Sequence, residues 1–597
     1  MTVDQKVKAL RALMKKTGVD CWYINGTDPH QSEYVCPRWR TRAWISGFTG
    51  SAGTVVITRK EALLWVDSRY FIQGAQQIEG SCFRLMKLDT ENTPSPMEWV
   101  RANLHKGQSV GIDHATLSLK TRGEMLDTFG PKGIVLMPMD DLLDAIWTDR
   151  PAVPDSKVIQ LSKEIAGYSR SEKFAQVREK MEELGCGFTL ISALDDIAWV
   201  TNLRGDDIAY NPVFLSYLLL GKEKAWLFTD PARFSADLLA EVTKDMEVLP
   251  YENAASTIKH LVHARDVVYL NPERTNMLMA GAIGKAKVIF GRDFTTDMKA
   301  RKNDVEMEGM RKSHLLDGVA LVNFLASLDR QHPNYDEYQL TEMLRAQRLR
   351  AKDCLGESFG PIAGFSENGA MCHYSATKEI HKTITGSGLV VLDTGGMYTF
   401  GMTDVTRTIL FGTATPEEIR DYTLVLKGHL ALAAAKFPKG TCGYQLDILA
   451  KQFMWQYGMT FYHGTGHGVG FRLNVHEGPQ NISHRPVQVP MEVGMVTSDE
   501  PGIYKEGRHG IRIENLIACQ AGETTEFGPF YQFETLTLCP YERALIDVSM
   551  LTDAEIRQIN AYHARVYASL KDLVDLQSLA YLKDATKPIE KGEANNG

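Results

Sequence analysis

The chain has 597 residues, of which 44% are hydrophobic and 23% are charged, a composition typical of a folded protein with several domains. Its net charge is −8 and it has no long Lys/Arg run, so the sequence gives no support to nucleic-acid binding. No apolar run approaches the roughly 18–20 residues that a membrane span requires. The nine cysteines are scattered singly, without a CxxC pair. This pattern predicts a cytoplasmic protein with neither a disulfide framework nor a zinc finger.

The first predicted element is an amphipathic helix at the N-terminus. Val3, Val7, Leu10 and Met14 recur at helical spacing, which predicts a helix over Val3–Lys16. The same stretch lacks the continuous apolar core of a secretory signal. We therefore expect it to belong to the fold.

Two segments of the first half follow one plan of helix, strand, polar loop and strand pair. The helix Val3–Lys16 corresponds to a second predicted helix, Glu172–Leu184, and Trp44 corresponds to Trp199 in the following segment. Alternation of strands with helices predicts two α/β domains, and the shared plan indicates a duplication. Chance similarity between two α/β segments is the alternative.

Two composition changes predict the domain boundaries. The first is a stretch with two prolines near Trp147–Ser156, and the second is a charged stretch near Thr295–Asp304. The predicted domains are therefore residues 1–152, 153–300 and 301–597.

The third domain opens and closes with helices. A long helical pattern covers Glu306–Leu328, and another amphipathic helix is predicted over 553–575. The polar end, residues 583–597, is typical of a frayed tail.

The third domain also contains a serine that resembles a hydrolase nucleophile. Ser358 lies in GESFG, which fits the G-x-S-x-G pattern of a strand-to-helix elbow. Pro361 and a loop-like run follow at once, so no helix is expected there. Ser358 is therefore interpreted as a structural residue.

Two predicted hairpins each bring a pair of carboxylates together. Two β-branched runs joined by a turn between Tyr398 and Thr399 would place Asp393 opposite Asp404. Directly opposed residues in an antiparallel pair have Cβ atoms about 4.5–5.5 Å apart, so the two carboxylates would repel each other unless a cation intervened.

The second predicted hairpin is centred on Gly507 and would oppose Glu500 to Glu514. Buried carboxylates need a cationic partner or a metal. Arg407 and Arg512 are the structural partners that the sequence offers as an alternative to metal.

Histidines on glycine-rich loops complete a candidate ligand set. His463 and His467 lie in HGTGHGVG, where glycines allow the backbone to approach a ligand closely. Four carboxylates with one imidazole favour hard or borderline cations such as manganese, and two divalent ions would neutralise the four charges. His373 and His476 lie in polar, glycine-rich segments and could orient a carbonyl or stabilise an oxyanion. A core histidine with satisfied hydrogen bonds is the alternative for each.

Taken together, these motifs resemble the pita-bread metallopeptidases, which include aminopeptidase P, prolidase, methionine aminopeptidase and creatinase. The similar runs are DTGGMYTFGMTDVTRT, HGTGHGVG, NVHEGP, DEPGIY and GIRIEN. The family's five metal ligands fall on Asp393, Asp404, His467, Glu500 and Glu514. Length and the run WISGFTGSAGTVVI followed by LLWVDSRYF make the chain most similar to cytosolic-type aminopeptidase P. The resemblance implies an α/β protein with two creatinase-like N-terminal domains before a pita-bread catalytic domain.

The resemblance also implies an activity. The expected enzyme removes the first residue from peptides whose second residue is proline, contains two divalent metals, most simply manganese, and forms a homodimer. Asp404 and Glu514 would bridge the metals, with Asp393 on one ion and His467 and Glu500 on the other. A hydroxide held between the ions would attack the Xaa–Pro carbonyl.

The remaining implied roles concern the substrate. Glu500 is expected to shuttle the proton, His373 and His476 to position the peptide and stabilise the transition state, and His463 to line the cleft. Arg69, in DSRYF, matches an arginine that contacts longer peptides in the family. Its alternative is a surface ion pair with an acid such as Asp67.

Two alternatives compete with an aminopeptidase. A prolidase would accept only Xaa-Pro dipeptides, and a metal-free pseudoenzyme would act as a binding module. Chain length argues against prolidase, and the complete ligand set argues against a pseudoenzyme. Arg472 and His509 are departures from the family pattern that could tune substrate preference.

Overall fold

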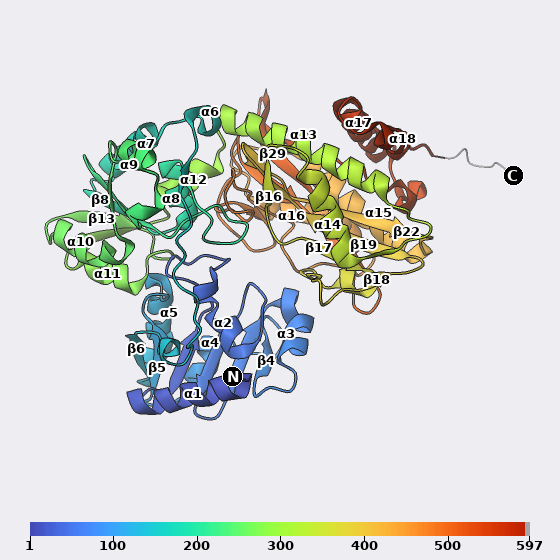
Figure 1. The fold of residues 1–597 in the computed structure, drawn as a ribbon. Helices are drawn as coiled ribbons and strands as arrows, with labels where there is room; N and C mark the ends of the chain where they lie inside the picture. Colours follow the sequence, from blue (N-terminus) through green and yellow to red (C-terminus); the bar gives the residue numbers. More distant parts are fainter. Residues whose placement is uncertain (592–597) are drawn as a thin grey trace. The chain divides into compact units, whose positions relative to one another are not determined.

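The computed structural model describes residues 1–591 and divides into two compact units (Figure 1). Unit 1 contains residues 1–163 and 168–296. Unit 2 contains residues 164–167 and the chain from Asp297 onward. The predicted domain boundaries at 152 and 300 stay predictions.

Unit 1 contains two six-stranded sheets with the same topology. The first has the order β4-β3-β2-β1-β5-β6 and the second β12-β11-β10-β8-β13-β14. The strands of the first sheet are β1 Cys21–Ile24, β2 Thr54–Thr58, β3 Ala62–Val66, β4 Arg84–Lys87, β5 Ser109–Asp113 and β6 Val135–Met139. Those of the second are β8 Phe188–Ile191, β10 Tyr217–Gly221, β11 Ala225–Phe228, β12 Glu247–Leu249, β13 Val267–Leu270 and β14 Lys287–Phe290. A small ladder joins β7 Ile159–Gln160 to β9 Leu203–Arg204.

The pairing directions of the two sheets also agree. In each, the three central strands are antiparallel and the outer neighbours are parallel. Asp67 and Asp230, which follow the third strand of their sheets, each accept a hydrogen bond from the backbone two residues on. This equivalence supports the duplication inferred from the sequence.

Helices cover both sheets of unit 1. Helix α1 spans Val3–Thr17, begins at a capping box on Thr2 and buries Val7, Leu10 and Met14, as the periodicity predicts. Helix α7 spans Arg170–Glu183, close to the predicted range. The other helices are α2 Thr41–Ser46, α3 Phe71–Ile78, α4 Pro96–Asn103, α5 Leu119–Phe129, α8 Leu194–Thr201, α9 Ala236–Val242, α10 Ala254–Leu261 and α11 Met277–Ile283.

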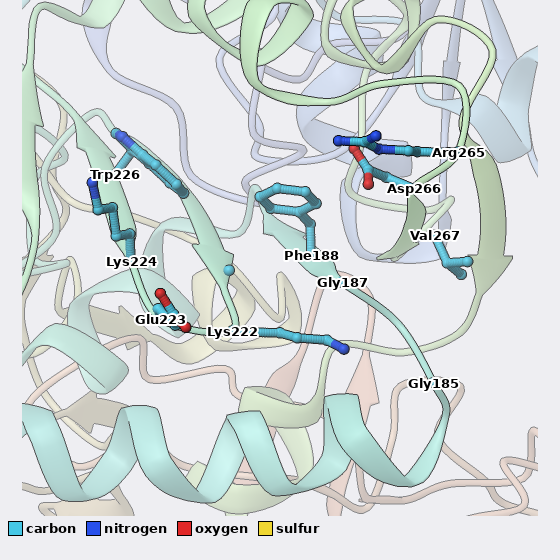
Figure 2. Close-up of a pocket in the computed structure, with 11 residues that line it drawn as sticks. Gly185, Gly187, Phe188, Lys222, Glu223, Lys224, Trp226, Arg265, Asp266 and Val267 are labelled. Atoms are coloured by element: carbon cyan, nitrogen blue, oxygen red, sulfur yellow. The ribbon is translucent and has the colours of Figure 1, made fainter.

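A pocket of about 510 Å³ lies where strands of the second sheet begin and end (Figure 2). Phe188 opens β8, Gly221 closes β10 and Val267 opens β13. Its charged lining mixes both signs and consists of Lys222, Glu223, Lys224, Arg265 and Asp266. The pocket contains none of the predicted site residues.

Unit 2 is built from short antiparallel sheets with helices packed against them. The main sheets have the orders β17-β19-β22 and β23-β30-β29-β26. Their strands are β17 Ile362–Phe365, β19 Gly388–Thr394, β22 Val405–Phe411, β23 Lys436–Pro438, β26 Val496–Asp499, β29 Asn515–Thr525 and β30 Gly528–Thr535. Smaller ladders contain β15 Tyr335–Asp336, β16 Cys354–Glu357, β18 Thr383–Ile384, β20 Gly396–Tyr398, β21 Gly401–Met402, β24 Gly466–His467, β25 Asn481–Ile482, β27 Gly502–Lys505 and β28 His509–Arg512.

The helices of unit 2 share its core with the strands and loops. They are α13 Asp304–Ser327, α14 Glu337–Arg348, α15 Pro416–Ala433, α16 Gly443–Trp455, α17 Asp553–Leu570 and α18 Leu576–Ala585. The chain passes from one unit to the other within α6 Lys163–Ala166, returns just after this helix, and passes again within α12 Phe294–Ala300. Helix α13 begins two residues earlier than predicted because Asn303 caps it.

The C-terminal prediction is wrong in two respects. The predicted helix over 553–575 ends at Leu570, and α18 follows from Leu576. The predicted frayed tail is ordered through the described residues, because Ile589 is buried and its N–H donates to Asn560 Oδ1 at 2.8 Å. An apolar side chain in a polar run is enough to hold such a segment against the core. Residues 592–597 lie outside the described part.

Two further predictions can be compared with the described residues. All nine cysteines are free thiols, as their spacing predicts. Among residues 1–591, no helix combines the length and the apolar character that crossing a bilayer demands.

Candidate metal centre

Asp393 and Asp404 lie at adjoining ends of a strand pair. Asp393 is in β19 and pairs with Thr406 of β22, whereas the sequence predicted that it opposes Asp404. The prediction is wrong by two positions because Tyr398 pairs with Gly401, which moves the turn one residue along the chain. Asp404 therefore lies in the loop immediately before β22.

Glu500 and Glu514 occupy the predicted register. Lys505 pairs with His509 in the β27–β28 hairpin, so the hairpin is centred on Gly507 as predicted. The β26–β29 ladder on the other side of the two glutamates keeps the same register. Glu500 and Glu514 thus fall opposite each other in the gap between two ladders.

Three of the predicted ligands come together around one point. Asp404, His467 and Glu514 each offer a ligand atom, and these atoms lie within 4.8 Å of one another. His467 Nε2 is 3.5 Å from Asp404 Oδ2 and 3.5 Å from Glu500 Oε1. The other ring nitrogen, Nδ1, lies 3.0 Å from the carbonyl oxygen of Gly468, which can only accept, so Nε2 carries the lone pair in the neutral ring.

The carboxylates raise one another's pKa values. Burial, followed by the charges of Asp393 and Glu500, raises the pKa of Asp404 well above its usual range. Burial and the charge of Asp404 do the same to the pKa of Glu514. For Glu500, burial is the largest cause and the pKa rises to about 7. A cluster in which several acids resist ionisation is one that a cation would stabilise.

Within residues 1–591, Asp393 has one carboxylate oxygen that is hydrogen-bonded by a protein group and one that is not. Its Oδ2 accepts a hydrogen bond from Arg512 Nη2 at 2.5 Å. Its Oδ1 is buried and has no hydrogen-bond partner among the described residues. A buried carboxylate oxygen without a donor is costly, and a cation ligated there would remove the cost. The residues therefore fit a divalent-metal site.

The alternative partners behave differently from each other. Arg512 does pair with Asp393, as the structural interpretation predicted. Arg407 instead donates to the carbonyl oxygens of Glu514 and Cys539. These bonds support the backbone of the site and do not involve the candidate ligand carboxylates.

His476 packs on a candidate ligand, and His463 is linked to the centre through Tyr504 and Arg512. His463 Nε2 lies 2.9 Å from the hydroxyl of Tyr504, and Tyr504 accepts a hydrogen bond from Arg512 at 2.8 Å. The ring of His476 packs edge-on against that of His467, with centroids 4.4 Å apart.

His373 approaches the same network through its neighbour in the chain. The carbonyl oxygen of Cys372 accepts a hydrogen bond from Arg512 Nη1 at 3.3 Å. Arg69, in unit 1, forms a two-pronged ion pair with Asp67 at 2.8 and 2.9 Å, the alternative that the sequence offered.

Sequence reasoning missed the hydroxyl groups that orient the ligands. Thr406 Oγ1 donates to Glu514 Oε2 at 2.8 Å. Ser498 Oγ lies 3.1 Å from Glu500 Oε1 and accepts from the backbone N–H of His467 at 2.9 Å. The sequence did offer one signal. Each hydroxyl residue lies two positions from a candidate ligand along an extended segment, so the two side chains share a face.

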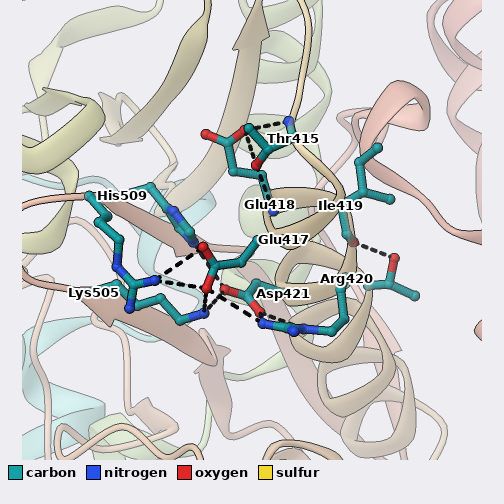
Figure 3. Close-up of polar contacts among 10 residues, drawn as sticks. Thr415, Glu417, Glu418, Ile419, Arg420, Asp421, Lys505 and His509 are labelled. Carbon is teal, nitrogen blue, oxygen red and sulfur yellow. Dashed lines mark hydrogen bonds and ion pairs between the residues drawn. The ribbon is translucent and has the colours of Figure 1, made fainter.

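His509 belongs to an ion cluster between the β27–β28 hairpin and helix α15 (Figure 3). Its Nε2 lies 3.0 Å from Asp421 Oδ2. Burial would raise the pKa of Asp421, but hydrogen bonds from His509, Lys505 and Arg420 outweigh it and lower the pKa to about 2. Lys505 also pairs with Glu417 at 2.7 Å. The cluster fastens the hairpin to helix α15.

Arg472 and Ser358 have structural contacts. Arg472 has a positive φ of 48°, and its Nη1 donates to the carbonyl oxygen of Thr399 at 3.1 Å. It thereby joins the loop between His467 and His476 to the turn between Asp393 and Asp404. Ser358 is buried and donates to the carbonyl oxygen of Thr403 at 2.8 Å, which agrees with its structural interpretation.

Comparison with known proteins identifies the parts of the chain. Residues 308–521 match metallopeptidase family M24, and 529–589 match the C-terminal region of peptidase M24. Residues 6–146 and 149–306 each match a creatinase/prolidase N-terminal domain.

Relatives match over the whole length. A Paracoccidioides brasiliensis protein named "Probable Xaa-Pro aminopeptidase P" is 38% identical and covers 98% of this chain and 100% of its own. "Xaa-Pro aminopeptidase 1" of Dictyostelium discoideum is 35% identical and covers 99% and 97%. The crystal structure of X-prolyl aminopeptidase from Caenorhabditis elegans, described as a cytosolic enzyme with a di-nuclear active site, is 34% identical, has a TM-score of 0.95 and covers 99% and 100%.

Proposed function

The chain belongs to the Xaa-Pro aminopeptidase P family of metallopeptidases, and we propose that it removes the N-terminal residue from peptides with proline in the second position. The observation that carries the proposal is the convergence of Asp404, His467 and Glu514 within 4.8 Å of one another. Loss of function in such a fold would be expected to begin with replacement of these ligands.

We infer that the site holds two divalent ions, because the related worm enzyme is described as having a di-nuclear active site. The residues that would hold them are Asp393, Asp404, His467, Glu500 and Glu514. A donor set of four carboxylates and one imidazole favours manganese. When bound, the two ions would supply an activated hydroxide and stabilise the charge that develops on the scissile carbonyl oxygen.

The surrounding residues would handle the proton and the peptide. Glu500, adjacent to His467, would carry the proton toward the leaving nitrogen. His476, packed on His467, would stabilise the developing oxyanion, and His373 would position the peptide. His463, held by Tyr504, would line the cleft.

Proline itself makes a dedicated site useful. It has no amide hydrogen and its φ is fixed, so an enzyme that binds extended backbone loses one contact at that residue. Packing against the pyrrolidine ring would replace that contact. Arg69 would contact the far end of longer peptides, and Arg472 would tune preference among them.

Two assignments concern the protein in the cell. We expect a homodimer and a cytoplasmic location; the nine free thiols and the worm enzyme, which is described as cytosolic, both favour that location. Sedimentation of the purified protein would test the dimer, because a monomer has a mass of 66.8 kDa.

A peptide beginning Arg-Pro-Pro tests the activity. The purified protein should release a single N-terminal arginine in the presence of manganese, and a chelator or Glu500→Ala should abolish the release. Cleavage of an Ala-Pro dipeptide alone would instead indicate a prolidase. If neither peptide is cleaved and no metal binds, the enzyme assignment is wrong.

A further inference from the structure

The segment that carries His373 has no regular structure of its own. A short 3₁₀ helix, Ser366–Ala370, ends before it, and β18 begins after it at Thr383. Residues 371–382 between them form neither helix nor strand, and Lys378, Glu379 and Ile380 are exposed. A segment of this kind is mobile unless specific contacts fix it.

One buried carboxylate supplies those contacts. Glu337, the first residue of α14, is 0% exposed. Its Oε1 accepts hydrogen bonds from the backbone N–H of Phe365 at 2.7 Å and from Asn368 Nδ2 at 2.9 Å. Its Oε2 accepts from the hydroxyl of Tyr374 at 2.7 Å and from the backbone N–H of Lys382 at 2.7 Å.

Two of these donors lie in the segment and two lie just before it. Phe365 and Asn368 lie before it, Tyr374 is the neighbour of His373, and Lys382 is its last residue. The backbone N–H of Glu337 also donates to the carbonyl oxygen of Lys382 at 3.1 Å, so the two residues bind each other reciprocally. The single side chain thus ties the segment to α14 near its start, at Tyr374, and at its end, at Lys382.

The four groups that donate to this carboxylate are all neutral. Four donors match the roughly four acceptor positions that a carboxylate offers, and the N-terminus of α14 adds a favourable dipole. A buried charge held in this way is costly to desolvate, so its contribution lies in the geometry that it imposes. A glutamine side chain cannot replace it, because the NH₂ group of the amide would face donors in place of one of the two accepting oxygens.

The segment is also joined to the metal centre on its other side. The carbonyl oxygen of Cys372 accepts from Arg512, whose guanidinium also holds Asp393. His373 therefore lies between two anchored neighbours, Cys372 toward the centre and Tyr374 toward Glu337.

We propose that Glu337 is a positioning residue that fixes the segment 371–382 so that His373 faces the metal centre. The inference rests on the proposed function, in which His373 positions the peptide. Glu337 itself touches neither the candidate ligands nor the substrate, so it acts through His373.

The first test is a double-mutant cycle. Glu337→Gln should lower kcat/KM for the Arg-Pro-Pro peptide by about 10- to 100-fold, the range typical of residues that orient an active-site group. In a His373→Ala background the same change should cost less than about threefold, because the residue through which it acts is gone. Equal losses in both backgrounds, or no loss in either, would overturn the proposal.

A second readout needs neither metal nor substrate. Trypsin should cut the chain after Lys378 or Lys382 several-fold faster in Glu337→Gln than in the wild-type protein. Equal cleavage rates would overturn the proposal even if the peptide assay showed a loss. If the wild-type protein cleaves no peptide, the proposed function fails and this readout still decides the role of Glu337.

The chain offers a matched control and a milder variant. Glu367→Gln removes an equal charge that pairs with the half-buried Lys382 ammonium at 2.6 Å, and it should leave peptide cleavage and trypsin cleavage after Lys378 unchanged. Tyr374→Phe removes only the donor next to His373 and should show the same pattern with a smaller loss. If Glu337→Gln does not fold, an unchanged Tyr374→Phe overturns the proposal.

Discussion

Asp404 is surrounded by the other members of the candidate centre. The charges of Asp393 and Glu500 act on it, and its ligand atom lies within 4.8 Å of those of His467 and Glu514. Asp404→Asn should lower the affinity for divalent ions by at least about 100-fold, since even residues that only orient a ligand change it by 10- to 100-fold. Titration calorimetry with Mn²⁺ would measure the change. Affinity as high as in the wild-type protein would remove Asp404 from the ligand set, and Glu367→Gln serves as the control.

A second titratable site lies in unit 1, far along the chain from these ligands. Burial, and then the charge of Asp141, raises the pKa of Asp113 to about 7. The folded state therefore holds this proton more tightly than the unfolded chain, whose Asp pKa is near 3.8. The associated stability is full below pH 4 and is lost as pH rises to 7.

The free energy of unfolding should therefore fall as pH rises. Between pH 5 and pH 8 the ionisation of Asp113 should lower it by about 3 kcal/mol, at 1.4 kcal/mol per pH unit up to the folded pKa of this residue. Asp113→Asn keeps the acceptor for the backbone N–H of Ala115 and should flatten the decline. Urea denaturation at the two pH values measures it. A variant with the same pH slope as the wild-type protein would contradict the assigned pKa.

At the scale of elements, β28 packs so closely on the 3₁₀ helix Ser366–Ala370 that only glycine fits between them. A Cβ on Gly510 would collide with the carbonyl oxygen of Gly369. Gly510→Ala should therefore destabilise unit 2 by at least about 2 kcal/mol, because the obstacle is backbone. It should also lower activity, since β28 ends with Arg512 and the 3₁₀ helix precedes His373 by three residues. Thermal unfolding and peptide cleavage measure the two effects.

Gly123 provides the comparison for that substitution. It lies inside α5, and a Cβ there would meet nothing within 4 Å. Gly123→Ala should be neutral or stabilise the protein by up to about 1 kcal/mol, as expected for alanine in a helix. If the two substitutions change the stability by the same amount, the close packing at Gly510 is not what excludes a side chain there.

The two hairpins show how far a sequence specifies such elements. The register around Gly507 was predictable because its turn, KEGR, is polar and both flanking runs are apolar and extended. The turn between Asp393 and Asp404 contains Tyr398 and Phe400, so its centre is ambiguous by one residue, and the predicted partner was wrong by two. The four carboxylates were predicted from the two hairpins, the choice of His467 came from the family resemblance, and the roles of all five stay predictions.

Contacts between distant elements were beyond prediction from a single sequence. Arg512 and Asp393 are 119 residues apart, and either arginine considered could have been the partner. Glu337 looks like any acid in the first turn of a helix, and only the folded chain shows that four residues between Phe365 and Lys382 donate to it. Such pairings depend on packing, which a local pattern does not encode.

At the scale of the whole molecule, the two units differ in what they hold. The two sheets of unit 1 have the same topology, and their strands contribute buried apolar side chains to its core. All five candidate ligands lie between residues 393 and 514, inside unit 2. Metal binding should therefore stabilise one unit directly and leave the intrinsic stability of the other unchanged.

Calorimetry of the full chain tests this division. With Mn²⁺ at 100 times its dissociation constant, the transition of unit 2 should gain about 2.7 kcal/mol, or roughly 4 °C for a unit of this size, relative to the protein with chelator. The transition of unit 1 should stay where it is. Hydrogen exchange of peptides from α1 and from β19 assigns the two transitions. A shift confined to unit 1 would place the metal elsewhere, and an equal shift of both would mean that the units unfold as one cooperative body.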